Sequence, residues 1–302
     1  MLSLVFCLME TMAQATPRVV IVSSDSTTAY LETTQAFISE LARGGVSAYD
    51  IRRLNVSEWP MQAAQPEKPT LYVTLGMRAT EALATSPVPV LSVLIPRSTF
   101  ERILRNSNRK SSSSFTAIYL DQTFQRQLAL IRLALPQAKR LGVLWGPDSW
   151  VKASALRSLA PLHGFSLTEA GLTDSFNVFP ELQQVLNDSD VFFAVADPII
   201  FNRNTIQNLL LTTFRANVPV VAFSPAYVQA GALLALHTSP EQVGRQAAAV
   251  VLQALSGKPL PDSPLEANDF EVSVNTHVAR SLNLSLDAQA LRLALRRLEH
   301  LP

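Results

Sequence analysis

Cysteine is almost absent from this sequence. Cys7 is the only thiol in 302 residues, so no disulfide can form within the chain. Removal of the first residues would leave none, which excludes a disulfide framework and thiolate chemistry in the processed protein. The histidines are far apart and lack the spacing of metal ligands, so no metal site is expected. They are His163, His237, His277 and His300.

The sequence also lacks a large excess of positive or negative charge. The formal net charge is +1 and the basic residues are scattered, so no nucleic-acid partner is expected. The sequence has no GxSxG, HExxH, Walker A loop or GxGxxG after a strand, and no cofactor is expected. No pair of carboxylates has a spacing typical of acid–base catalysis. A hydrolase or transferase is the alternative hypothesis, but no catalytic motif in the sequence supports it. The chain is therefore predicted not to be an enzyme.

The N-terminus has the features of an export signal. Leu2–Met9 is a short apolar run, and Ala13-Gln14-Ala15 fits cleavage after Ala15. The run is far shorter than the roughly 20 residues that span a bilayer. A basic residue ahead of the run is missing, which is also consistent with a start codon further upstream. We predict a signal peptide over residues 1–15 and a periplasmic protein; a disordered cytosolic N-terminus is the alternative.

From Pro17 onward, short β-rich runs alternate with helical patterns. Such alternation is typical of βαβ units and parallel sheets, and two successive series predict two lobes. The predicted strands cover 18–23, 48–54, 70–75, 88–95, 115–120, 140–145, 166–170, 191–196, 219–223, 232–237 and 270–275. The predicted helices cover 28–43, 123–135, 150–162, 178–186, 202–216, 239–257 and 291–301.

An internal repeat supports the two lobes. TLYVTLG, a helical segment and VPVLSV follow one another in the first half, and VFFAVAD, a helical segment and VPVVAFS do so in the second. The helix after residue 238 has the clearest boundaries. Ser239, Pro240 and Gln242 predict a capping box with proline in the first turn, and Gly257 predicts the end.

Three segments carry a resemblance to a known family: Gln125–Pro147, Val218–Leu260 and Glu271–Leu284. Together they are similar to the periplasmic substrate-binding proteins of ABC transporters, and most of all to the tryptophan/tyrosine-type branch. The resemblance implies an α/β fold of type I, with two doubly wound parallel-sheet lobes joined by a three-crossover hinge. It also implies delivery of a small-molecule ligand to an ABC permease at the membrane, without covalent chemistry, and a monomer is expected.

In that fold the crossings would fall near Asp121, Thr238 and Pro264. The N-terminal lobe would then comprise 16–120 plus 239–264, and the C-terminal lobe 121–238 plus 265–302. One feature departs from the family. Related sequences carry a Thr/Ser-Asp-Pro turn after the fourth strand, whereas this chain has Pro96-Arg97-Ser98 there. A cation thus replaces an acid at a ligand-facing loop, which leaves open a different ligand or a lobe pair that no longer binds one.

The carboxyl ends of parallel strands place the candidate site residues, because ligands of open α/β sheets bind beyond those ends. The first lobe contributes Ser23, Ser24, Gly76, Met77, Arg78, Pro96 and Arg97, and the second contributes Trp145, Asp197, Ser224, Pro225 and Tyr227. His237 lies beside a predicted crossover.

Each of these residues also has a structural interpretation. Arg97 is either a bidentate clamp for a carboxylate or a solvated loop residue. Asp197 either pairs with a ligand amine or caps a helix ahead of Pro198. Trp145 either stacks on a ring or fills a lobe core. If Arg97 and Asp197 faced each other across the lobes, they would suit a zwitterion such as an amino acid. A ligand-sensing subunit of a membrane signalling protein would use the same cleft and remains the alternative to transport.

Overall fold

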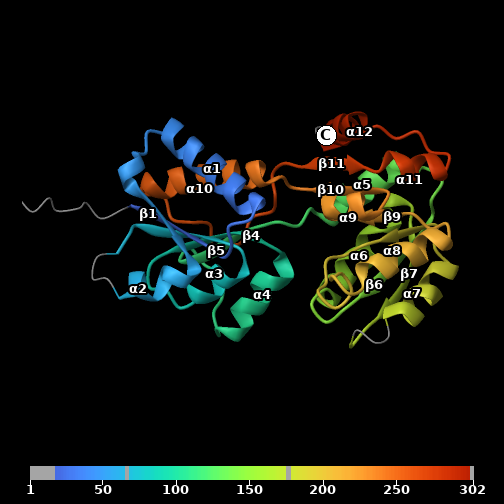
Figure 1. The fold of residues 1–302 in the computed structure, drawn as a ribbon, viewed down its shortest axis with the longest axis horizontal. Helices are drawn as coiled ribbons and strands as arrows, with labels where there is room; N and C mark the ends of the chain where they lie inside the picture. Colours follow the sequence, from blue (N-terminus) through green and yellow to red (C-terminus); the bar gives the residue numbers. More distant parts are fainter. Residues whose placement is uncertain (1–17, 65–67, 175–177, 300–302) are drawn as a thin grey trace, which may run out of the picture.

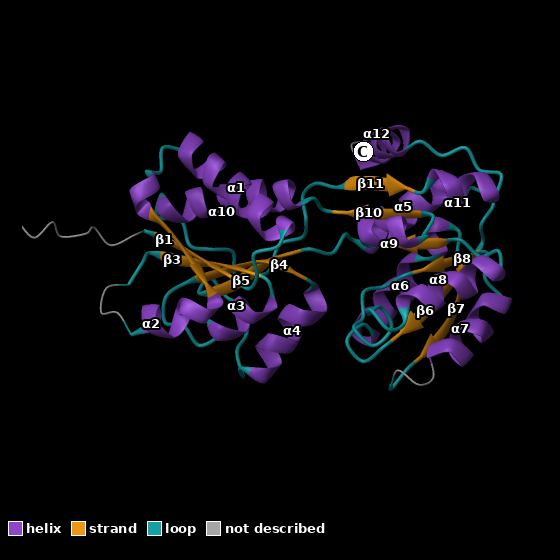
Figure 2. Cartoon of the chain, in the orientation of Figure 1, coloured by secondary structure: helices purple, strands orange, loops and turns teal. Residues whose placement is uncertain are grey.

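The computed structural model describes residues 18–64, 68–174 and 178–299. The predicted signal peptide lies outside the described residues. None of the described helices combines the length and apolar character that a membrane span requires. Two α/β lobes lie side by side along the longest axis, each with its own sheet (Figures 1 and 2).

The first lobe contains a five-stranded parallel sheet in the order β2-β1-β3-β4-β5. Its strands are β1 (Val19–Ser23), β2 (Ile51–Asn55), β3 (Leu71–Leu75), β4 (Val90–Ile95) and β5 (Phe115–Tyr119). Helices α1 (Thr28–Arg43) and α10 (Pro240–Leu255) cover one face, and α2 (Trp59–Ala63), α3 (Met77–Ala82) and α4 (Arg97–Asn106) cover the other (Figure 1).

The continuously apolar strand β1 illustrates why this sheet is covered on both sides. Val19 and Ile21 join the core beneath α1 and α10, while Val20 and Val22 join the core on the α3 and α4 face. Successive side chains of a strand point to opposite faces, so only a sheet with two covered faces can bury all four. The apolar run of β1 therefore indicates a lobe of three layers, with helices on both faces of the sheet.

Helices α1 and α10 approach each other closely at Gly244. A Cβ at this position would lie 2.5 Å from the backbone oxygen of Thr33 and 2.8 Å from the Cβ of Ala36. The predicted capping box is present: Ser239 accepts from the Gln242 N–H, and the Gln242 side chain accepts from the Ser239 N–H. Ser256 caps the C-terminal end, and Gly257 follows with a φ of +96°. The α10 helix thus belongs to the first lobe although it comes late in the chain.

The second lobe contains a six-stranded sheet in the order β11-β10-β9-β8-β6-β7. Its strands are β6 (Arg140–Trp145), β7 (Ser166–Gly171), β8 (Val191–Phe193), β9 (Val220–Ala222), β10 (Leu234–His237) and β11 (Glu271–Val274). Helices α5 (Phe124–Ala134), α6 (Ala153–Leu159), α11 (Thr276–Ser281) and α12 (Ala288–Glu299) pack on one side; α7 (Val178–Asn187), α8 (Ile206–Arg215) and α9 (Pro225–Ala230) pack on the other.

The predicted parallel sheets are present, with one exception: β11 pairs with β10 in the antiparallel sense. The reason lies in the crossings. The chain leaves the second lobe at the end of β10 and returns near the same end, so it can enter the neighbouring strand only in the opposite direction. Other predicted elements are shorter than expected. Residues 48–50 form a 3₁₀ turn ahead of β2, and two 3₁₀ turns flank α6 within 150–163.

Within the described residues the chain passes between the lobes three times: between β5 and α5, between β10 and α10, and between α10 and β11. The third crossing begins later than residue 264. The Leu265 N–H donates to the Ala117 carbonyl at 2.8 Å, and the Leu265 carbonyl accepts from the Tyr119 N–H at 2.9 Å. Leu265 also forms a parallel bridge with Ile118, so it pairs with the edge strand β5 and belongs to the first lobe.

Candidate ligand-binding cleft

A cavity of about 940 Å³ lies between the lobes, beside the crossings. Its volume is in the range of small-molecule sites, and its lining is mostly apolar. The first lobe contributes Ala29, Leu94, Pro96, Arg97, Glu101, Pro240 and Glu266. The first two crossings contribute Leu120, Asp121, Gln122, Thr123 and Thr238, and the end of β10 contributes His237. The second lobe contributes Phe124, Gln125, Gln127, Val151, Lys152, Ala155, Leu159, Ala194, Val195, Ala196, Phe223, Ser224, Pro225, Ala226 and Tyr227.

The structure brings together part of the predicted site. The predicted residues that line the cavity are Pro96, Arg97, Ser224, Pro225, Tyr227 and His237. Those that do not line it are Ser23, Ser24, Gly76, Met77, Arg78, Trp145 and Asp197. For the residues that line the cavity, a role in binding a ligand stays a prediction. For the residues that do not line it, the geometry argues against such a role.

The polar groups at the ends of β1 and β3 bind one another. The Ser24 hydroxyl accepts from the Ala79 N–H at 2.8 Å, and the Arg78 guanidinium donates to the Ser24 carbonyl. Ser23 donates to the Asp25 carbonyl at 2.6 Å. Gly76 has a φ of +80°, which ends β3 and starts α3 in a turn that disfavours a side chain. These residues build the β1–α3 corner and leave few groups for a ligand.

Trp145 and Asp197 are buried within the second lobe. Trp145 is 0% exposed, and its indole Nε1 donates to the Glu169 carboxylate at 2.7 Å. Asp197 accepts the N–H groups of Asp148, Ser149 and Ile199 at 2.9–3.1 Å. Its carboxylate holds the loop after β6 against the loop after β8. The suggested pair of Arg97 and Asp197 around a zwitterion is therefore not formed.

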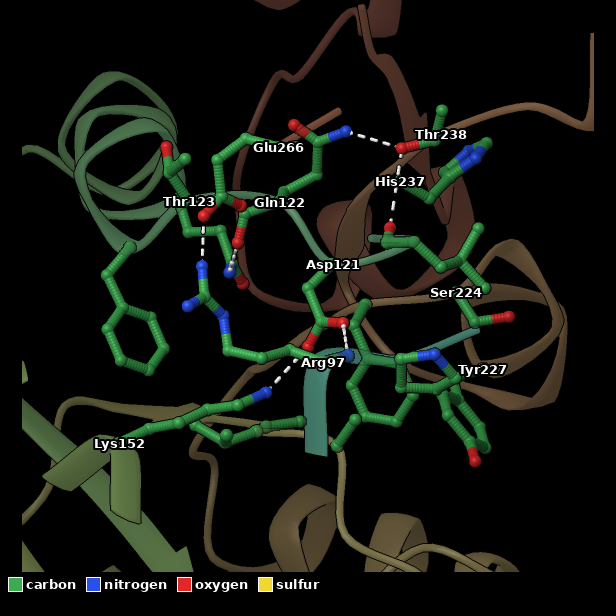
Figure 3. A pocket seen from close by; sticks show the side chains of 18 of the residues that line it. Arg97, Asp121, Gln122, Thr123, Lys152, Ser224, Tyr227, His237, Thr238 and Glu266 are labelled. Atoms are coloured by element: carbon green, nitrogen blue, oxygen red, sulfur yellow. Dashed lines mark hydrogen bonds and ion pairs between the residues drawn. The ribbon is translucent and has the colours of Figure 1, made fainter. Parts of the chain in front are cut away.

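Arg97 begins α4 and is already engaged. Its backbone N–H donates to the Asp121 carboxylate at 2.6 Å, and its guanidinium pairs with Glu266 and lies 4.5 Å from the centroid of the Tyr119 ring. Pro96 offers no side-chain cap, so Asp121 satisfies this helix start from the first crossing. Asp121 also accepts the Lys152 ammonium at 2.6 Å from the second lobe. Figure 3 shows these four charged side chains close together.

Sequence reasoning missed Asp121, Lys152 and Glu266 as cavity residues. Asp121 marked a crossing in the sequence, but nothing in the motif pattern placed its carboxylate between the lobes. Glu266 follows a proline-rich connection, where no strand end or helix start singles it out. A contact over 169 positions, such as that between Arg97 and Glu266, has no local signal.

The backbone at the end of β4 is unusual. Leu94 has a φ of +52°, and the register between β4 and β5 shifts between Ser92 and Ile95. A side chain in this left-handed region costs on the order of 1 kcal/mol, and such strain and bulges concentrate next to binding sites. The Leu94 side chain lines the cavity. The bulge therefore turns the strand end so that Leu94 and Pro96 both face the cleft.

Aromatic rings form the second-lobe wall. Phe223 and Tyr227 lie 5.0 Å apart with an edge-to-face angle of 79°, and Phe201 supports both at 5.4 and 5.9 Å. Ser224 caps α9 between them by accepting the Ala226 N–H. Burial raises the pKa of the Tyr227 phenol, which keeps the ring uncharged. This wall offers flat apolar faces to a ligand, and Figure 3 shows Ser224 and Tyr227 side by side.

Gln122 connects the three crossings. Its side-chain amide donates to the Thr238 hydroxyl at 2.7 Å and to the Asp269 carbonyl at 3.0 Å, and its oxygen accepts from Arg126 at 2.6 Å. His237, next to Thr238, contacts the Ser273 hydroxyl at 3.0 Å. Burial lowers the pKa of the His237 imidazole, which favours the neutral form of the ring. These hydrogen bonds therefore join the three crossings to one another beside the cavity.

Residues 18–297 match the family model described as ABC transporter substrate binding protein. The chain belongs to this family. A tyrosine-binding protein of Clostridioides difficile (strain R20291) is 21% identical over 206 residues, which cover 67% of this chain and 59% of that relative. The match thus spans less than two thirds of the relative's length. The family predicted from the sequence is confirmed.

Solved structures show the same fold. The complex of an ABC domain with L-Trp from Streptococcus pneumonia has a TM-score of 0.65 and 16% identity, and covers 92% of this chain and 98% of that one. The ligand-free, open structure of a substrate-binding protein with adhesive properties from Clostridium difficile has a TM-score of 0.68 and 17% identity, and covers 89% and 96%. Proteins of this family bind small ligands and deliver them to ABC permeases, and the predicted two-lobed α/β fold is confirmed.

Proposed function

We propose that this protein captures an aromatic amino acid, or a molecule of similar build, in the cleft and presents it to an ABC importer outside the cytoplasm. The observation that carries the proposal is the cavity itself. It is large enough for such a ligand, lies between two lobes joined by three crossings, and has an aromatic wall on one side. Further support comes from the relatives, one named for tyrosine and one solved with L-Trp.

The physical role of the aromatic wall is to recognise a ring. Offset or edge-to-face aromatic pairs contribute about 0.5–1.5 kcal/mol beyond the area that they bury. Tyr227 and Phe223 hold each other in such a geometry before any ligand enters. A preorganised wall spares the ligand part of the ordering cost of binding. Closure of the lobes would then bring the charged side chains around α4 of the first lobe toward the other end of the ligand.

The proposal is tested by titration calorimetry of the full chain with L-tyrosine, L-tryptophan, L-phenylalanine and L-leucine. We expect the aromatic amino acids to bind at least about 10-fold more tightly than L-leucine, since each 1.4 kcal/mol is a factor of ten. Tyr227→Ala should remove most of that preference, whereas Tyr49→Ala, at a side chain that is 92% exposed, should not. Absence of heat with all four amino acids would refute the proposed ligand class. Size-exclusion chromatography would test the expected monomer.

A further inference from the structure

The charges around the cavity do not balance. Arg97 and Lys152 are the cations of its lining, and Glu101, Asp121 and Glu266 are the carboxylates. The described lining therefore carries one surplus negative charge. A buried or half-buried charge without a partner is costly, so a cavity of this kind favours a ligand that supplies the missing charge.

Both cations of the lining already have a carboxylate partner. Lys152 lies 2.6 Å from Asp121, and the two side chains are only 10% and 17% exposed. Arg97 pairs with Glu266 and covers the Tyr119 ring. A ligand carboxylate would have to share either cation with the carboxylate that the cation already binds. The two carboxylates at one cation would repel each other, which lowers the gain from binding an acid.

Glu101 is the carboxylate without a partner. It lies on α4 one turn after Arg97, borders the cavity and is half-buried. No hydrogen bond or ion pair joins its side chain to any other described residue. Burial raises the pKa of the nearby Tyr119 phenol to about 12; Arg97 lowers this pKa, and Glu101, Glu266 and Asp121 raise it further.

We propose that the ligand binds through a cationic nitrogen that faces Glu101, and that a ligand carboxylate contributes little to affinity. This inference rests on the proposed function, because it orients the aromatic ligand within the same cleft. The ring lies on the second-lobe wall at Phe223 and Tyr227, and the ammonium lies against α4 of the first lobe. Glu101 is then a specificity-determining residue that selects amines over acids.

Three compounds that share one ring separate these contributions. L-tyrosine carries both charges, tyramine keeps only the ammonium, and 3-(4-hydroxyphenyl)propionate keeps only the carboxylate. In calorimetry with the full chain, tyramine should bind within about 5-fold of L-tyrosine. The propionate should bind about 10- to 100-fold more weakly, the range expected for one charge-assisted hydrogen bond.

Glu101→Gln supplies the matched variant. It should weaken tyramine binding by the same 10- to 100-fold and leave the propionate nearly unchanged. Glu81→Gln, at an exposed carboxylate on α3 outside the cavity, is the control and should change neither. Binding of L-tyrosine together with a propionate that binds as well as tyramine would overturn this inference and leave the proposed function intact. Absence of heat with all three compounds would overturn both.

Discussion

Replacement of Gln122 by alanine tests how the two lobes are held together. Gln122 is 6% exposed and sits on the first crossing. Its amide reaches Thr238 on the second crossing and the Asp269 carbonyl on the third. Its carbonyl oxygen accepts from Arg126, at the start of α5. One side chain therefore connects all the segments that pass between the lobes.

The expected loss follows from the groups that alanine would leave behind. A hydrogen bond contributes about 0.5–1.5 kcal/mol net, and a buried donor or acceptor left unsatisfied costs about 1–3 kcal/mol. Thr238 is 7% exposed, and without Gln122 its hydroxyl would keep only a long 3.4 Å contact with the Leu120 carbonyl. Asp269 is half-buried, so water can replace part of its lost bond. We expect Gln122→Ala to lower the free energy of unfolding by about 2–3 kcal/mol.

Urea unfolding followed by tryptophan fluorescence measures this effect, since Trp59 reports on the first lobe and Trp145 and Trp150 on the second. Gln125→Ala is the matched control. It removes the same side chain three positions further on, where the residue is exposed and has no hydrogen bond among the described residues. The control should stay within about 0.5 kcal/mol of the native protein. A Gln122→Ala variant that stays within the same limit would refute the view of this glutamine as the clamp of the hinge.

Three further predictions concern other contacts. Arg102→Ala should weaken ligand binding about 2- to 5-fold in calorimetry, because its 2.9 Å ion pair with Asp148 joins the two lobes while both side chains are partly exposed; Arg105→Ala, exposed on the same helix, should have no effect, and equal affinities for all would contradict this. Asp197→Asn should lower the free energy of unfolding by about 2 kcal/mol, because one of its carboxylate oxygens becomes a donor facing N–H groups, yet leave the affinity of the folded protein unchanged; a parallel loss of affinity would place Asp197 in the site after all. The stability of the native protein should fall as the pH rises from 10 to about 12, because the unfolded state releases the Tyr119 proton that the folded state retains. Tyr119→Phe should show a smaller fall in urea midpoint over that pH range, and an equal fall would refute the assignment.

Much of the fold could be predicted because its signals are local. The run at β1, the helix α1 and the capping box of α10 follow from residues that lie within a few positions of each other. The direction of β11 could not be predicted, because it depends on where the third crossing returns to the sheet. The start of α4 at Arg97 was also missed. Its N-cap is a proline without a side-chain cap, and the acceptor comes from Asp121, 24 positions away.

The candidate site was predictable only where a strand end alone determines position. That rule selected Ser224 and Tyr227 after β9 and Arg97 after β4, and these residues line the cavity. It failed at β6, where Trp145 points into the lobe core, and after β8, where Asp197 binds backbone N–H groups of its own lobe. The rule gives the edge of the sheet at which a residue lies, but the partner of each side chain depends on packing.

Asp121 connects the first crossing to both walls of the cleft. Its carboxylate holds the first turn of α4 in one lobe and the Lys152 ammonium in the other, and the next residue is the clamp Gln122. Asp121 therefore contacts both lobes from the first crossing. A ligand shifts an equilibrium between two arrangements of the lobes only through contacts that differ between the two states. The proposed ligand would place its ammonium against Glu101 on α4 and its ring on α9. Because these two contacts lie on different lobes, such a ligand would favour the arrangement in which the lobes are close.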